Sequence, residues 1–176
     1  LDSLKYSYKE YNQEASRIET VVETYEKALD SNNTLSEPIL TQTQREYTVL
    51  DNKIVKRVSE YYEQGLDTPF STQYSYKEIG TRTVKDKDGK DTEVTVVLNV
   101  LDTFEPGIDR ATSTQRTWNE IEYNVQDPID SSKTLGTRVV TITDNEELGQ
   151  ATGYKKTWKE GERVDSLDFE TGLVSP

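Results

Sequence analysis

The 176-residue sequence contains no cysteine, no histidine and no methionine. Without histidine, a serine or cysteine nucleophile lacks the usual base of a catalytic triad. Without histidine and cysteine, the chain cannot build a zinc site from those ligands. Glycine-rich phosphate-binding loops are also missing. These absences predict a protein that is not an enzyme and that binds no cofactor.

The first residue is Leu1, in the middle of a hydrophobic pattern, which indicates that a leader or membrane anchor preceded it. No apolar run of 18 residues occurs, so we expect a soluble chain that meets a membrane only through a removed anchor. A chain without cysteine can work in a cell envelope without disulfides. The abundant Thr, Asn, Asp, Lys and Tyr are typical of exported domains of Gram-positive bacteria. We therefore expect a location on the extracellular side of the membrane or on the cell surface.

Positive charge is scarce: 21 lysines and arginines face 33 aspartates and glutamates, which gives a net charge of -12. Because neutralising phosphates needs clustered basic residues, we expect no nucleic-acid partner. Hydrophobic residues make up only 32% of the chain, while tyrosine occurs eleven times. Tyrosine combines apolar area with a polar tip, so the composition predicts a thin, half-wet core.

The first third of the chain shows a repeat with spacings of four and three residues, which predicts a coiled-coil helix. A second, looser apolar stripe follows a cap at Ser36-Glu37-Pro38 and continues toward Gly65. Together they predict an antiparallel helical hairpin over residues 3–64, within a helical segment 1–66. We expect the first helix to form a homodimer or higher homo-oligomer through one apolar seam. The seam consists of Leu4, Tyr8, Tyr11, Ile18, Val22 and Tyr25.

Beyond Thr68-Pro69 the hydrophobic pattern changes to a period of two residues, which indicates strands. Turn signals such as Glu105-Pro106-Gly107 and Asp127-Pro128 separate the alternating stretches. The connections are too short for crossover helices, so residues 67–176 are expected to form a curved antiparallel meander of about five to six strands. The predicted fold class is α+β, with the second helix packed on the sheet as one domain.

The stretch "TVKDKDGKDTEVTV" at residues 83–96 has two interpretations. Four carboxylates, which are Asp86, Asp88, Asp91 and Glu93, could supply oxygen ligands to calcium. The glycine comes too early for a calcium loop, however, and three lysines alternate with the acids. Asp88-Gly89 between two strand-like stretches is instead a strong hairpin signal, and this second interpretation is favoured.

Aromatic residues near the end of the chain suggest a carbohydrate site. Trp118 and Trp158 each follow a threonine, and with Tyr154 they could form a flat platform for a sugar ring. The alternative is that these rings supply the bulk of a sparse core, which is the more common role of buried tryptophan.

Two family resemblances add expectations. "GTRTV" at residues 80–84 recurs as "GTRVV" at 136–140, inside "IEYNVQDPIDSSKTLGTRVVTITDNEELGQATGYKKTWKEGERV" at 121–164. This stretch resembles the five-glycine surface-repeat domain of bacterial wall proteins, with Gly136 and Gly161 at matching positions. The resemblance implies a non-catalytic wall module with amino-sugar binding.

The order of the expected elements is similar to a second family. A membrane-proximal helix, then "DNKIVKRVSEYYEQGLD" at residues 51–67, then a curved sheet resembles the nuclear-transport-factor-like assembly component of type IV secretion systems, including Gram-positive conjugation machines. That resemblance implies a domain that self-associates and contacts other channel proteins.

Taken together, the sequence predicts a non-catalytic extracytoplasmic domain of a membrane- or wall-anchored envelope protein. We expect it to act as a scaffold through self-association and contacts with other envelope or secretion-channel proteins. The alternative is a cell-wall carbohydrate-binding or adhesion module of a surface protein.

Overall fold

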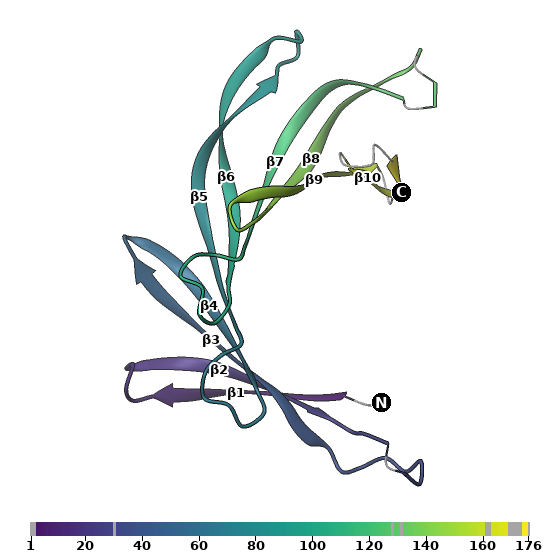
Figure 1. Cartoon of the computed structure of the whole chain (residues 1–176). Coiled ribbons are helices and arrows are strands. Elements are labelled where there is room, and N and C mark those ends of the chain that lie inside the picture. The colour runs from purple at the N-terminus through teal and green to yellow at the C-terminus, as the bar shows by residue number, and fades with distance from the viewer. Residues whose placement is uncertain are drawn as a thin grey trace. The chain divides into compact units, whose positions relative to one another are not determined.

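The computed structural model describes residues 3–29, 31–127, 129–130, 132–160, 163–168 and 174–175, and these residues form strands, turns and loops without a helix. The order of the strands in the sheet follows their order in the chain, and the strand pairs within residues 3–26, 39–63 and 113–147 are antiparallel (Figure 1). The predicted α+β class is therefore wrong, and the fold is all-β. The strands are β1 Ser3–Asn12, β2 Arg17–Glu26, β3 Ile39–Asp51, β4 Ile54–Glu63, β5 Ser71–Lys85, β6 Asp91–Phe104, β7 Ser113–Gln126, β8 Thr134–Glu147, β9 Gln150–Glu160, β10 Arg163–Asp168 and β11 Val174–Ser175.

The chain divides into two compact units. Unit 1 comprises residues 1–76 and 102–112, and unit 2 comprises residues 77–101 and 113–176. Strands β5 and β6 each contribute residues to both units. The sequence placed a boundary between residues 66 and 67 because helices were expected to end there, whereas the structure has strands on both sides of that point.

The repeat that predicted the first helix belongs to the β1–β2 hairpin. In this hairpin Leu4 lies opposite Tyr25 and Tyr11 lies opposite Ile18, with the turn between them. When apolar residues pair symmetrically across a turn, their spacings along the chain can alternate between four and three residues. The same spacings define a heptad repeat. Local composition decides between the two structures, because Ile18, Val21 and Val22 are β-branched and lose side-chain freedom in a helix.

The second expected helix is the β3–β4 hairpin. Its two-residue turn consists of Asn52 and Lys53, which have positive φ angles of 48° and 67°. Two successive residues with positive φ match the twist of antiparallel strands. Asp51, where a helix break was expected, pairs with Ile54 across this turn.

The six residues of the predicted coiled-coil seam do not share a surface. Cross-strand pairing puts Tyr11, Ile18 and Val22 on one face of the β1–β2 hairpin, while the remaining three lie on the opposite face. A helical seam requires a heptad period, and these strands have a period of two instead. The fold therefore excludes a dimer through such a helical seam.

The core of unit 1 is small and partly charged. The side chains of Val21 and Val58 are buried, and so is the carboxylate of Glu19, which is 1% exposed. Tyr47 lies beside them on β3, where the guanidinium carbon of Arg17 is 3.4 Å from the centre of its ring.

The core of unit 2 follows the alternation that the sequence predicted for its strands. Inward-facing residues of β6, β7, β8 and β9 are buried, and neighbours such as Val97 and Val139 are more than half exposed. Trp118 lies opposite Ile142, and Val140 lies opposite Trp158, so the two indoles are part of one packed layer. The buried residues are Val96, Leu98, Val100, Trp118, Val125, Val140, Ile142 and Trp158.

Residues 86–90 form the turn between β5 and β6, as the favoured interpretation of the acidic stretch predicted. The side-chain oxygen of Asp86 accepts hydrogen bonds from the backbone amides of Asp88 and Lys90, both at 2.9 Å. Gly89 has a φ of 78° and donates its amide to the carbonyl of Asp86 at 3.0 Å. The turn therefore needs a residue that tolerates the left-handed region at position 89.

We predict that Gly89→Ala lowers the free energy of unfolding by about 1 kcal/mol, because an L-residue is strained at this φ. An added Cβ meets no atom within 4 Å, so the loss is conformational rather than steric. Urea unfolding measures it. Lys87→Ala, at a turn position without positive φ, is the control. Equal stabilities of the two variants would contradict the assignment of the turn.

Candidate functional site

Unit 2 contains an apolar groove, which lies between the β5–β6 hairpin and strands β7 and β8. Its volume is about 290 Å³. We call it the unit 2 groove. It is lined by Val84, Lys85, Asp86, Thr92, Val94, Thr95, Val96, Asn119, Glu120, Ile121, Tyr123 and Val139.

Three residues give the groove its exposed apolar wall. Ile121 and Val139 are direct partners across β7 and β8 and are 47% and 60% exposed, and Tyr123 is 40% exposed. Contiguous exposed apolar surface on a folded chain is typical of a place where another molecule binds.

A second hollow of about 450 Å³ shares Val84, Ile121 and Tyr123 with the groove and extends it toward Arg138. At this end Glu122 forms ion pairs with Arg138, at 2.9 Å, and with Lys156. Burial raises the pKa of Glu122, but hydrogen bonds and charges from Lys156 and Arg138 outweigh it, so the pKa lies below its ordinary value. The carboxylate is thus neutralised by its own neighbours.

The structure brings the three residues of the expected sugar platform onto one face, but it does not leave the indoles open. Trp118 and Trp158 are 5% and 8% exposed. The guanidinium carbon of Arg82 lies 4.5 Å above the Trp118 ring, and that of Arg138 lies 4.0 Å above the Trp158 ring. A sugar would have to displace both arginines to stack on these rings.

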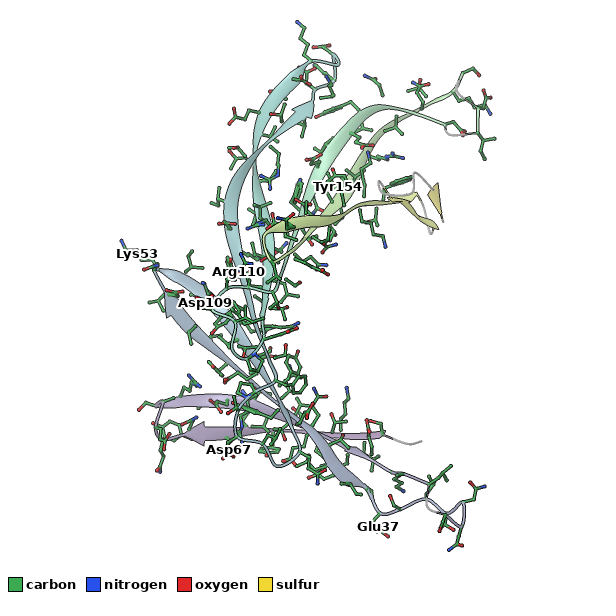
Figure 2. All side chains as sticks on the ribbon, viewed as in Figure 1. Glu37, Lys53, Asp67, Asp109, Arg110 and Tyr154 are labelled. Atoms are coloured by element: carbon green, nitrogen blue, oxygen red, sulfur yellow. The ribbon has the colours of Figure 1, made fainter. Side chains whose placement is uncertain are left out.

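The partners of the platform residues are also protein groups. The indole nitrogen of Trp118 donates a hydrogen bond to Glu120 at 2.9 Å. Tyr154, on β9, lies opposite Asp144 (Figure 2). Burial and the nearby charges of Glu120 and Asp144 raise its pKa. These contacts favour the core interpretation of the aromatic residues over the platform.

We predict that both tryptophans are shielded from iodide in the native chain and that peptidoglycan fragments leave their emission unchanged. Arg138→Ala removes the group stacked on Trp158, so it should increase quenching and lower the free energy of unfolding by about 1 kcal/mol. Arg110→Ala, in an exposed loop of unit 1 (Figure 2), is the control. A shift in emission on addition of glycan would restore the platform hypothesis.

The four candidate calcium ligands do not form a metal site in the part of the chain that the structure describes, which holds no group of three or more metal-binding side chains. Asp86 directs its oxygen to the backbone of its own turn. Asp91 pairs with Lys85 at 2.5 Å. Of the lysines that alternate with the acids, Lys85 thus forms an ion pair with one of the candidate ligands.

Unit 1 contains a charged cluster that the sequence did not single out. The buried Glu19 accepts hydrogen bonds from Arg17 at 2.8 Å, from Arg45 at 3.2 Å and from Asn12 at 3.2 Å. Burial raises the pKa of Glu19, yet these three donors together hold it below the ordinary value. The ionised carboxylate therefore joins β1, β2 and β3.

We predict that Glu19→Gln lowers the free energy of unfolding at neutral pH by about 2 kcal/mol, because both arginines lose a charged partner but keep access to water. The folded pKa is depressed, so the stabilisation is complete above the unfolded pKa of about 4.3 and is lost as pH falls through the folded value. The stability difference from the parent should therefore shrink below about pH 4 in denaturant titrations.

Glu14→Gln is the matched control for this prediction, since Glu14 lies exposed in the turn of the same hairpin. It should leave the free energy of unfolding at neutral pH unchanged. A Glu19→Gln difference that stays constant from neutral to acidic pH would show that the carboxylate does not titrate as described.

Comparison with family models, curated proteins and solved structures found no match to this chain. Within the described residues there is no helix of the length and hydrophobicity that a membrane span requires.

Sequence reasoning identified neither the groove nor the Glu19 cluster. Ile121 and Tyr123 were recognised as alternating strand residues, but the sequence alone did not show that their face stays open. Arg17 and Arg45 lay inside expected helices, where their common approach to Glu19 could not be seen. Strand pairing between residues 17–26 and 39–51 was the missing information.

Proposed function

We propose that this chain is a non-catalytic, extracytoplasmic module of a membrane- or wall-anchored bacterial envelope protein. It acts as a scaffold through self-association and contacts with other envelope proteins. The observation that carries the proposal is the unit 2 groove with its exposed Ile121–Val139 pair.

A second copy of the chain is the occupant that fits this groove best. The whole chain carries a net charge of -12, so two copies repel each other over most approaches. At the groove and the adjoining hollow, Lys85 and Arg138 face Asp86, Glu120 and Glu122, so the local charge is nearly balanced. Two copies can therefore meet there with little repulsion while burying aliphatic side chains.

The envelope location is supported by the composition, and by the resemblance of residues 121–164 to a wall-protein repeat. That stretch runs from β7 through β8 and β9, and its Gly136 adopts a φ of 88° within β8. The likeness to the type IV secretion component depended on a helix before the sheet. The residues that the structure describes contain no such helix, so a conjugative role gains no support from this likeness.

Sedimentation velocity over a range of concentrations tests self-association. We expect a monomer–dimer equilibrium that shifts toward dimer as salt is raised, because salt screens the repulsion between two acidic chains. Ile121→Asp combined with Val139→Asp should shift the equilibrium to monomer, by at least about tenfold in the dissociation constant.

Ile79→Asp is the matched control for this experiment. Ile79 is 75% exposed on β5 of the same unit, and it does not line the groove. It should leave the dimer intact. A parent chain that remains monomeric at high concentration, or a dimer that survives the double substitution, would contradict self-association through the groove.

A further inference from the structure

The first strand of the sheet has one open edge. In the order of the strands β1 stands at the end, with β2 as its neighbour (Figure 1). Their pairing runs from Ser3, opposite Glu26, to Asn12, opposite Arg17. The backbone N–H and C=O groups on the other side of β1 therefore have no partner strand among the described residues. Such an edge is a template on which a further strand can pair.

Two common protections of a sheet edge are missing from β1. The strand contains no proline, and its pairing with β2 keeps one register throughout, so no bulge interrupts it. Residues 5–11 are all exposed. We call this open side of β1 the β1 edge. Natural sheet edges are commonly shielded by proline or by a bulge, whereas the β1 edge presents a regular row of backbone groups.

Positive charge lies on one face of β1. Lys5 and Lys9 are four residues apart in a strand, so they share a face, and both are exposed. They lie opposite Thr24 and Thr20 of β2, which carry no charge. We call this side of β1 and β2 the lysine face.

Acidic residues on and around the lysine face do not cancel its charge. Glu26 lies at the end of β2. Glu46 lies one strand further, on β3, and pairs with Arg57 at 3.1 Å. Glu10 belongs to the opposite face of β1 and pairs with Arg45 at 3.5 Å. The lysine face thus has a positive local charge in a chain whose net charge is -12. It attracts acidic side chains of an added strand.

The opposite face of β1 is aromatic. Tyr6 and Tyr8 are 56% and 41% exposed. The Tyr6 ring meets that of Tyr25 edge to face, with ring centres 5.6 Å apart. The hydroxyls of Tyr8 and Tyr25 both donate hydrogen bonds to Glu23. Because the rings are held in place beforehand, apolar side chains of an added strand can pack against them at little cost in ring freedom.

The two faces together specify the sequence of a partner strand. Successive residues of a strand point to opposite faces, so the partner needs acidic residues on one face and apolar residues on the other. Its sequence therefore alternates between the two types. A second copy of β1 fits poorly, because antiparallel pairing with itself brings the two lysine faces to the same side of the sheet.

We propose that the β1 edge binds an extended segment of a partner protein in which acidic and apolar residues alternate. The segment joins the sheet as a further strand. Its acids lie beside Lys5 and Lys9, and its apolar residues lie beside Tyr6 and Tyr8. This inference rests on the proposed scaffold function, since it identifies one of its protein contacts. The β1 edge belongs to unit 1, so the contact does not use the unit 2 groove.

The experiment is an amide-resolved NMR titration of the whole chain with the peptide acetyl-Glu-Val-Glu-Val-Glu-Val-amide. We expect saturable shifts at residues of β1 and β2. A peptide of the same composition in two blocks, Glu-Glu-Glu-Val-Val-Val, should bind at least about tenfold more weakly. An alternating peptide with a methyl group on every backbone nitrogen cannot donate hydrogen bonds to the edge, so it should cause no saturable shift.

Reversing the charge of the lysine face tests its role. Lys5→Glu combined with Lys9→Glu should weaken binding of the alternating peptide at least about tenfold. Lys77→Glu combined with Lys87→Glu is the matched control, because it makes the same change in net charge at exposed positions of unit 2. It should change the affinity less than about twofold at physiological salt. If the double reversal does not fold, Lys5→Gln combined with Lys9→Gln replaces it and should also weaken binding.

The groove variant, Ile121→Asp combined with Val139→Asp, separates this proposal from self-association. It should bind the alternating peptide as the parent does, whether or not the parent dimerises. Loss of peptide binding in this variant would place the site in the groove instead. A groove variant that still dimerises, and whose dimer the peptide dissociates, would assign the β1 edge to a second copy.

The remaining outcomes also contradict the proposal. Equal weakening by the two pairs of lysine substitutions would reduce the effect to general repulsion by an acidic chain. Binding of the methylated peptide would exclude strand addition, and equal binding of the block peptide would exclude recognition of the alternation. Absence of saturable shifts with the alternating peptide would remove the site and leave the sedimentation result untouched.

Discussion

Stacking of arginine on aromatic rings is the interaction on which both units depend. Arg17 covers Tyr47 in unit 1, and Arg82 and Arg138 cover Trp118 and Trp158 in unit 2. A sheet with few hydrophobic residues has little to pack against its inner face, so long side chains from neighbouring strands must exclude water there. A guanidinium does this well, because its flat, weakly hydrated surface lies on a ring while its edge still donates hydrogen bonds.

The N–H groups at the edge of a stacked guanidinium need hydrogen-bond acceptors. This need explains where two of the acidic residues lie. Glu19 pairs with Arg17 in unit 1, and Glu122 pairs with Arg138 in unit 2. In each case the carboxylate is held ionised by its neighbours although burial acts in the other direction. Each unit therefore has the same local arrangement of an aromatic ring, an arginine on its face and a carboxylate at the arginine's edge. Lysine could not replace these arginines without losing either the stack or the fork of donors.

The strands of unit 2 could be predicted from the sequence because their alternation is regular. Val94, Val96 and Leu98 recur with a period of two and therefore share one face of the strand, and Asp88-Gly89 marks the turn before them. The first 66 residues were assigned wrongly because two signals conflicted. The spacing of the apolar residues favours a helix. The β-branched and aromatic composition around Val21 and Val22 favours strands, and it is this second signal that agrees with the structure. The turns offered little help: Asn52 and Lys53 take positive φ without glycine.

The candidate site was less predictable than the strands, since it depends on which parts of the sheet surface remain uncovered. Where an arginine is stacked on a ring, as on Trp118, the surface is closed and the aromatic residue has a structural role. Where charges balance around aliphatic residues, as at Ile121, those residues stay exposed. The same scarcity of hydrophobic and basic residues that shapes the sheet thus determines which of its surfaces are closed by arginine and which stay open.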